Sequence, residues 1–193
     1  MAQKGIVFVI SAPSGAGKQT VIRRSQEEGV SLATTISATT RPPRSTETDG
    51  HDYYFLSMED FQKRVAENAF VELAEVHGNL YGTLSKDLDR CINSGQDVVM
   101  EVDVQGLRSL AKLGYDVVSI FIMPPSVDEL ERRLRRRGTD SDAVIQIRLR
   151  NAKAEMDARK EYDYVVVNDN LEAAVANVAA IICAEHCRSI REK

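Results

Sequence analysis

One short segment constrains this chain more than any other: a glycine-rich turn, Ser11–Thr20, set between two regular elements. The apolar run Gly5–Ile10 before it is typical of a buried strand, and Thr20–Gln26 after it can begin a helix. Successive backbone N–H groups in such a turn form an anion site, and the positive end of the helix dipole adds to it. The segment therefore predicts a phosphate-binding loop.

The residue types within the turn fit this interpretation. Gly15 and Gly17 permit the turn and a close backbone approach, and Lys18 can reach the β- and γ-phosphates of a nucleoside triphosphate. The match to the pattern G-x-x-x-x-G-K-[ST] is incomplete, because Ala12 replaces the first glycine and Gln19 replaces the hydroxyl residue. The alternative is a glycine-serine turn with an ordinary surface lysine. The expected triphosphate contacts are Ala12, Pro13, Ser14, Gly15, Ala16, Gly17, Lys18, Gln19 and Thr20.

Composition narrows the class of protein. A chain of 193 residues is expected to form one domain, and its net charge of −4 argues against a general nucleic-acid binder. The three cysteines show no C-x-x-C spacing, which favours a reduced, cytoplasmic setting over a disulfide framework. The first apolar run is too short for a signal peptide or a membrane span. We therefore expect a cytoplasmic protein with no membrane or nucleic-acid partner.

The order of apolar segments predicts the fold class. Val98–Met100, Val117–Met123 and Tyr164–Val167 are strand-like runs separated by helical patterns, which is typical of a parallel sheet covered on both faces. The stretch 37–83 differs, since it has short, half-polar strands and little helix, and we expect a small antiparallel insertion there. Ser57 and Ser126 begin capping boxes, and Ser141 can cap a long helix. The prediction is an α/β fold: a P-loop parallel sheet with helices on both faces, plus a small α+β insertion.

Two arginines and a carboxylate in the insertion are candidates for binding an acceptor. Arg41 and Arg44 lie on a proline-stiffened segment, where two guanidinium groups can hold a phosphate, and Tyr53 can add a hydroxyl. Glu72 alternates with apolar neighbours, so it faces the other side of its strand. In a cleft it can accept N1–H and N2–H of guanine, which adenine cannot offer together. The alternative for the two arginines and for Glu72 is a solvated surface position, and the alternative for the tyrosine ring is half-buried packing on the sheet.

Acidic residues end one buried strand. Glu101 and Asp103 follow Val98–Met100, and the ligand crevice of an open α/β sheet lies at the carboxyl ends of its strands. We expect these carboxylates beside the phosphate loop, where a hydrated Mg²⁺ that bridges phosphates needs oxygen ligands. Thr20 and Glu101 are the candidate metal ligands, in part through water. A structural ion pair is the alternative.

An arginine run, Arg132–Arg137, predicts a mobile lid. Arg133 and Arg137 share one helical face, and Arg148 meets them if its helix pairs with theirs. Such a cluster suits a lid that closes over a transferring phosphoryl group. A solvated helix face and a nucleic-acid patch are the alternatives.

These segments together resemble the guanylate kinase family over nearly the whole chain. The matching segments are Ala-Pro-Ser-Gly-Ala-Gly-Lys at 12–18, Ser-Ala-Thr-Thr-Arg-Pro-Pro-Arg at 37–44, Gly-His-Asp-Tyr-Tyr-Phe at 50–55, Phe-Val-Glu at 70–72, Gly-Asn-Leu-Tyr-Gly-Thr at 78–83, Glu-Val-Asp-Val-Gln-Gly at 101–106, Pro-Pro-Ser at 124–126, Arg-Gly-Thr at 137–139 and Val-Asn at 167–168. The resemblance implies a single domain with a core (1–36, 84–130 and 151–193), a nucleotide-monophosphate-binding insertion (37–83) and a lid (131–150).

The resemblance also assigns roles to residues. It implies that Arg41, Arg44, Tyr53 and Tyr81 hold the phosphate of GMP, and that Ser37, Glu72, Thr83 and Asp103 read guanine, with Glu101 beside them. It implies lid arginines at Arg133, Arg137 and Arg148, and a contact of Asn168 with the adenine of ATP. Gln19 departs from the family, whose members often have Ser or Gly at this position. The catalytic set is then Lys18, Arg41, Arg133, Arg137 and Arg148.

The implied activity is transfer of the γ-phosphoryl group of MgATP to GMP or dGMP in purine nucleotide metabolism. Three other functions stay open on the sequence: a related kinase acting on a phosphorylated ribose, a non-catalytic guanylate-kinase-like binding module, and an RNA-binding protein that uses the arginine run. The expected cofactor is Mg²⁺ with ATP, and the expected partners are ATP and GMP.

Overall fold

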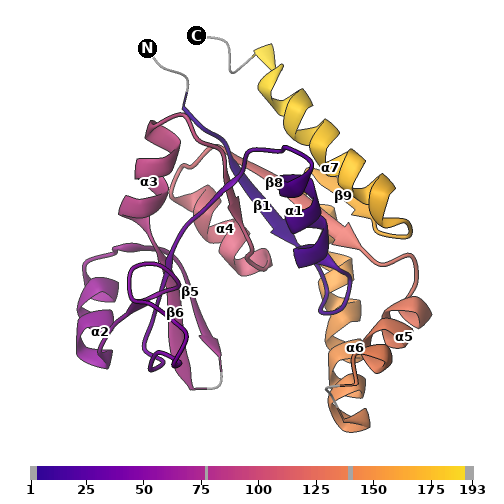
Figure 1. Cartoon of the computed structure of the whole chain (residues 1–193), viewed down its shortest axis with the longest axis horizontal. Helices are drawn as coiled ribbons and strands as arrows, with labels where there is room; N and C mark the ends of the chain where they lie inside the picture. The colour runs from indigo at the N-terminus through magenta and orange to yellow at the C-terminus, as the bar shows by residue number, and fades with distance from the viewer. Residues whose placement is uncertain (1–3, 77, 139–140, 190–193) are drawn as a thin grey trace. The chain divides into compact units, whose positions relative to one another are not determined.

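The computed structural model describes residues 4–76, 78–138 and 141–189 (Figure 1). Its strands are β1 (Val7–Ser11), β2 (Ala33–Thr34), β3 (Ser37–Thr39), β4 (Tyr54–Phe55), β5 (Phe70–Val76), β6 (Asn79–Leu84), β7 (Val98–Met100), β8 (Val117–Met123) and β9 (Tyr164–Val167). Its helices are α1 (Lys18–Glu27), α2 (Met58–Ala66), α3 (Ser85–Asn93), α4 (Val104–Lys112), α5 (Val127–Arg137), α6 (Asp142–Asp157), a 3₁₀ turn η1 (Ala158–Glu161) and α7 (Leu171–His186).

The chain divides into two compact units. Unit 1 comprises residues 1–7, 32–100 and 105–117, and unit 2 comprises residues 8–31, 101–104 and 118–193. The bounds of core, insertion and lid given above remain a prediction. No helix among the described residues is long and apolar enough to cross a membrane.

A five-stranded sheet of order β2-β7-β1-β8-β9 forms the core. Strand β2 runs parallel to β7, with Ala33 opposite Val98, and β8 runs parallel to β9, with Met123 opposite Val167. All residues of β1 and β7 are buried, because parallel strands are covered by helices on their faces. In unit 2, α1 and α7 pack against each other beside β1, β8 and β9 (Figure 1). The predicted fold class, a parallel sheet flanked by helices, is confirmed.

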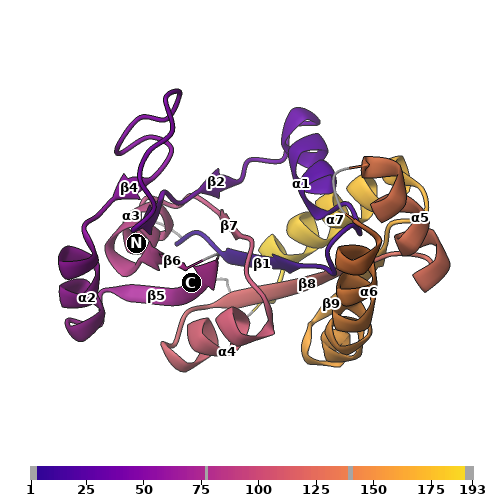
Figure 2. The same ribbon diagram turned by 90° about the horizontal axis from the view of Figure 1, so that it is seen from below.

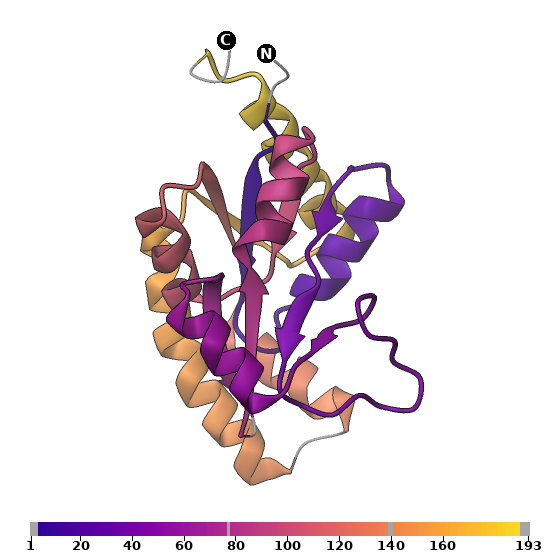
Figure 3. The same cartoon turned by 90° about the vertical axis from the view of Figure 1, so that its left-hand side faces the viewer.

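A second sheet in unit 1 has the order β4-β3-β6-β5, with α2 lying across it (Figure 3). Phe61 of α2 is fully buried, and its ring stacks on Phe70 at 4.6 Å between centroids. The predicted N-cap is present, since the Ser57 hydroxyl accepts the N–H of Asp60 at 3.0 Å. The pairs β3–β6 and β5–β6 are antiparallel, as expected for the insertion. The expectation is wrong for β3 and β4, which pair in parallel because the long connection 40–53 returns the chain in the same direction.

Helices α5 and α6 form a pair in unit 2 (Figure 2). Leu130 and Leu134 of α5 pack with Ile145, Leu149 and Ala152 of α6 in one buried cluster. This cluster explains why the arginine-rich helix folds against a partner despite its charge, since its apolar positions share one face.

The two caps predicted in this helix pair have different outcomes. Ser126 caps α5 by accepting the N–H of Glu129 at 3.1 Å. Ser141 occupies the predicted N-cap position of α6. Its hydroxyl makes no capping hydrogen bond, so the predicted side-chain cap is wrong. The negative charge of Asp142 lies in the first turn of α6 instead, where it favours the helix dipole.

Candidate active site

The predicted phosphate loop connects β1 to α1 within unit 2. Gly15 and Gly17 have φ values of +98° and +94°, which L side chains rarely adopt. A side chain at either position would also displace a neighbour, because a Cβ on Gly15 would lie 2.9 Å from Cδ2 of Leu134, and one on Gly17 would lie 2.5 Å from Nδ2 of Asn168. Gly17 is the N-cap of α1 and supplies no side-chain acceptor to the helix, so the first amides of α1 can receive an anion.

Lys18 lies among carboxylates at the carboxyl end of the sheet. Its Nζ is 3.4 Å from Oε2 of Glu101, and the hydroxyl of Ser11 donates to the carbonyl of Val102, which fixes the Glu101–Asp103 segment beside the loop. Glu101 and Asp103 are exposed. The structure therefore places the predicted lysine and the predicted carboxylates together.

Glu155 of α6 is a carboxylate at this site that the sequence analysis missed. It accepts the N–H of Ser14, a residue of the phosphate loop. Loss of hydration of the carboxylate raises the pKa of Glu155, and the Asp103 charge adds to this, whereas the Ser14 N–H and the Lys18 charge act in the opposite direction. No local signal marks this residue, because it lies on an ordinary polar helix face.

Two of the three arginines predicted for the lid contact the predicted phosphate loop. Arg133 donates through Nη2 to the carbonyl of Asn168 (2.9 Å) and through Nη1 to the carbonyl of Ala16 (3.4 Å). Arg148 donates to the hydroxyl of Ser14. The side chain of Arg137 and the whole of Thr139 lie outside the described residues. Arg133 and Arg148 thus approach the loop from α5 and α6.

Glu129 orients two arginines of α5. It accepts from Nε of Arg132 at 2.6 Å and from Nε of Arg133 at 2.8 Å. These two guanidinium groups lower the pKa of Glu129 to about 2. The carboxylate remains ionised at neutral pH and holds Arg133 in its position against the loop.

Two residues at the start of α1 face solvent. Gln19 and Thr20 are exposed. The Thr20 hydroxyl and the Glu101 carboxylate supply oxygen ligands of the kind that Mg²⁺ prefers. No group of three or more His, Cys, Asp or Glu side chains suited to a metal occurs among the described residues. This donor set fits an ion held chiefly by phosphates and water, with one or two protein ligands.

In unit 1, the predicted acceptor residues form a cluster around Arg41. Its guanidinium lies 5.5 Å from the ring centre of Tyr53 and 5.8 Å from that of Phe55, and it is hydrogen-bonded to Tyr81. The rings of Tyr53 and Tyr81 meet edge to face at 6.1 Å. Three of the four residues expected to bind the acceptor phosphate are therefore neighbours.

Glu47 is a second residue of this cluster that the sequence analysis missed. It pairs with Nη2 of Arg41 at 2.8 Å and accepts the backbone N–H of Arg44 at 2.7 Å, while Nη1 of Arg44 is 4.0 Å away. The Arg41 guanidinium and the Arg44 N–H lower the pKa of Glu47. Its spacing, three residues after Arg44 and six after Arg41, is a weak signal, since a polar loop commonly carries a glutamate.

A row of polar side chains crosses three strands of the same unit. Ser37 of β3 lies opposite Thr83 of β6, and Thr83 lies opposite Glu72 of β5. The Thr83 hydroxyl donates to Oε1 of Glu72 at 2.9 Å, and Thr83 is only 3% exposed. We call these three residues the polar row. They are the predicted base-reading residues, except for Asp103, which belongs to unit 2.

A β-bulge determines how Glu72 is presented. The register between β5 and β6 shifts between Phe70 and Glu72. Val71 is therefore 2% exposed and Leu73 is 52% exposed, although simple alternation gives them the same face. The bulge redirects Glu72 toward Thr83, which no alternation pattern predicts.

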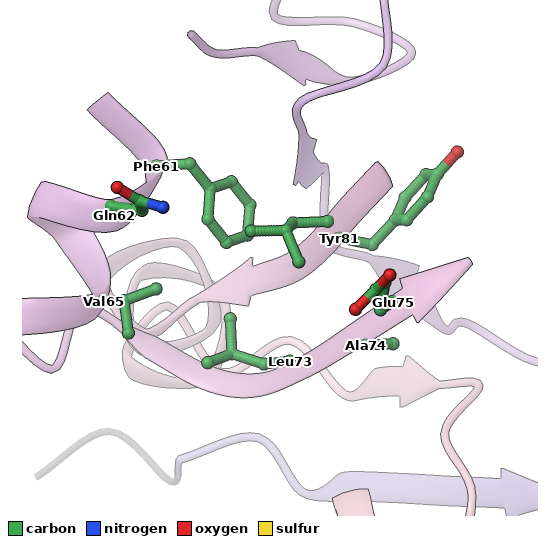
Figure 4. A pocket seen from close by; sticks show the side chains of 8 residues that line it. Phe61, Gln62, Val65, Leu73, Ala74, Glu75 and Tyr81 are labelled. Atoms are coloured by element: carbon green, nitrogen blue, oxygen red, sulfur yellow. The ribbon is translucent and has the colours of Figure 1, made fainter. Parts of the chain in front are cut away.

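An apolar pocket lies on α2 and the adjoining β5–β6 hairpin (Figure 4). It shares only Tyr81 with the cluster around Arg41, and Glu75 is the charged residue in its lining. Its lining residues are Phe61, Gln62, Val65, Leu73, Ala74, Glu75, Leu80 and Tyr81. Its largely apolar lining does not suit a phosphate.

A glycine-rich loop between β1 and α1 of a parallel sheet, with an arginine-bearing helix pair against it, defines a P-loop α/β protein. The sequence model of the family described as "Guanylate kinase" matches residues 4–185. The chain belongs to the guanylate kinase family, as its motifs predict.

Known relatives cover nearly the whole chain. It is 49% identical over 191 residues to the guanylate kinase of Syntrophotalea carbinolica, and the aligned region covers 99% of this chain and 91% of that protein. It is 46% identical over 186 residues to the guanylate kinase of Nitrosomonas europaea, with 96% and 92% covered. The crystal structure of guanylate kinase from Anaplasma phagocytophilum is similar with a TM-score of 0.73 and 34% identity, covering 98% of this chain and 90% of that one.

Proposed function

We propose that this enzyme transfers the γ-phosphoryl group of ATP to GMP, and to dGMP, giving ADP and the nucleoside diphosphate. Two sets of residues support the proposal: the phosphate loop with Lys18 in unit 2, and the arginine cluster with the polar row in unit 1. The single observation that carries the choice of acceptor is the bond from Thr83 to Glu72, which fixes a half-buried carboxylate in the same unit as the arginine cluster.

The polar row suits guanine by its hydrogen-bonding chemistry. A carboxylate has about four acceptor positions, so Glu72 can accept from a ligand while it accepts from Thr83. Guanine presents N1–H and N2–H side by side, whereas adenine has an unprotonated N1. A site built on such hydrogen bonds discriminates by a factor of ~10⁴–10⁵ against a base that leaves its polar groups unpaired.

The phosphate of GMP is assigned to Arg41, Arg44, Tyr53 and Tyr81. Arg41 is held by Glu47 and lies against aromatic rings, so its guanidinium is already oriented when a phosphate arrives. Preorganised donors lower the cost of binding and of stabilising charge in the transition state.

The chemistry then requires positioning and charge neutralisation more than proton transfer. The acceptor oxygen belongs to an ionised phosphate, so no side chain has to act as a strong base. Lys18 and the loop amides hold the donor phosphates, and Arg133, Arg137 and Arg148 neutralise charge on the transferring group. Closure of the lid excludes water, which otherwise hydrolyses ATP.

Magnesium is proposed as the cofactor with ATP. Glu101 would hold it, in part through water, together with the hydroxyl of Thr20. When bound, the ion neutralises phosphate charge. Since Gln19 replaces the usual loop hydroxyl, the protein contribution to its coordination is expected to be small.

We further propose a cytoplasmic setting in purine nucleotide metabolism. Cys91, Cys183 and Cys187 are all free thiols, and two of them are exposed, which suits a reducing compartment.

An assay of ADP release from MgATP, with GMP, dGMP, AMP, UMP or ribose phosphates as acceptor, tests the proposal. Turnover is expected with GMP and dGMP only. Absence of GMP-dependent turnover overturns the assignment, and GMP binding without turnover identifies a binding module instead.

Glu72→Gln tests the base-reading role directly. It replaces one acceptor oxygen by a donor, so we expect kcat/KM for GMP to fall by about 100-fold or more, with preference for GMP over AMP reduced. Glu75→Gln is the matched control, since it removes the same charge from an exposed position of the same strand. Normal GMP kinetics in Glu72→Gln contradict the assignment.

A further inference from the structure

Asn168 is fixed by bonds to three different elements of unit 2. It follows β9 and is 6% exposed. Its backbone N–H donates to the carbonyl of Met123 at the end of β8 (2.8 Å), and its own carbonyl accepts from Arg133 of α5 (2.9 Å). Its side-chain Nδ2 donates to the carbonyl of Ala16 in the phosphate loop at 2.8 Å. The side chain therefore acts on the loop from a rigid position.

The bond to Ala16 determines where the next amide points. In a trans peptide the C=O and N–H vectors are opposed, because the group is planar. Asn168 and Arg133 hold the Ala16 carbonyl on one side of the loop, so the N–H of Gly17 is directed to the other side. That N–H is one of the donors that a glycine-rich loop offers to a polyphosphate.

The packing at Gly17 shows how closely the amide of Asn168 approaches this peptide. A Cβ on Gly17 would lie 2.5 Å from Nδ2 of Asn168. A glycine permits many backbone conformations, so Gly17 itself does little to hold the Ala16–Gly17 peptide in the orientation observed. Two side chains outside the loop donate to the Ala16 carbonyl and favour this orientation, and the bond from Nδ2 of Asn168 is the shorter of the two.

We propose that Asn168 is a positioning residue of the donor site: its side-chain amide holds the Ala16–Gly17 peptide in the orientation that presents the Gly17 N–H to the phosphates of ATP. The inference rests on the proposed function, because it concerns the ATP site. It differs from the role implied by resemblance, a contact with adenine, since the Asn168 amide nitrogen is engaged by the loop itself.

A ligand without a base separates the two roles. Inorganic tripolyphosphate has the phosphates of ATP but no adenine. If Asn168 acts through the loop peptide, Asn168→Ala weakens ATP and tripolyphosphate by the same factor. Loss of one hydrogen bond to a charged ligand predicts a Kd about 10- to 100-fold higher for both. KM for GMP should stay within about 2-fold.

The experiment is calorimetric titration of the full chain with tripolyphosphate and with ATP, beside wild type. Asn168→Asp is the second variant: it fills the same space but turns a carboxylate oxygen toward the Ala16 carbonyl, and an equal or larger loss is expected. Asn170→Ala is the matched control, since Asn170 lies in the same loop and caps α7 through a 2.8 Å bond to the N–H of Ala173. It should lower the melting temperature and leave the Kd for tripolyphosphate unchanged.

Two outcomes overturn the inference. One is wild-type affinity for tripolyphosphate in folded Asn168→Ala together with weaker binding of ATP, which assigns the residue to adenine. The other is seen in the wild-type protein alone, where we expect the amide proton resonance of Gly17 to shift downfield on addition of tripolyphosphate. A resonance that does not move excludes the Gly17 N–H as a donor and overturns the inference. If wild type binds neither ATP nor tripolyphosphate, the proposed function fails as well.

Discussion

Glu47 gives a prediction in which two physical effects have opposite signs. Its carboxylate accepts from Nη2 of Arg41 and from the backbone N–H of Arg44. Glu47→Gln removes the negative charge and leaves one of these two donors without an acceptor. In net charge, Arg41 and Arg44 contribute +2 and Glu47 contributes −1, so the cluster of the three changes from +1 to +2. Charge alone therefore predicts tighter binding of the dianionic phosphate of GMP.

Preorganisation predicts the opposite result, and we expect it to dominate. The side chains of Arg41 and Glu47 are only 17% and 14% exposed, so their pair is held in one geometry. In Glu47→Gln the side chain of Arg41 is no longer held by a carboxylate, so it has to become ordered when GMP binds. Immobilising one such side chain weakens binding by about 2- to 12-fold. Looser backbone at Arg44 adds to this. We expect KM for GMP to rise by about 10-fold, with KM for ATP unchanged.

Steady-state ADP release at saturating ATP, with titration of GMP in the absence of ATP, measures this effect. Glu67→Gln serves as the control, because it removes one exposed charge from the same unit away from the cluster. A lower KM for GMP in Glu47→Gln would refute the reasoning and show Glu47 to be a competing anion.

Two further predictions concern stability. The pKa of Glu129 is lowered to about 2, so the stability that its ionised carboxylate contributes is complete above pH 4.5 and is lost as the pH falls through about 2. The urea midpoint of Glu129→Gln should therefore differ from that of wild type at about pH 7 and converge with it near pH 2. A constant difference between those pH values would contradict this. Phe61→Ala removes a fully buried ring stacked on Phe70 and should cost about 3–5 kcal/mol in urea unfolding. A loss below about 1 kcal/mol would show that the α2 interface collapses into the space.

The sequence by itself determined the features that are built from adjacent residues. The phosphate loop is contiguous: a buried strand, two glycines that need positive φ, and a helix start follow one another within 5–27, so their physical requirements are visible in the order of residues. The same holds for the caps at Ser57 and Ser126 and for the buried strands β7 and β8, because these depend on local hydrogen bonds and on local apolar runs.

Only the tertiary structure decided which distant groups meet. Asn168 binds the carbonyl of Ala16 across 152 positions, and the β5 bulge sends Glu72 to Thr83 where alternation alone gives no direction. Glu47 and Glu155 are ordinary polar residues until packing brings each to a donor. The physical reason is the same for all of these contacts: a hydrogen bond between distant residues depends on the path of the whole chain. The residues next to an amide or a carboxylate in the sequence do not predict which distant group it will bond.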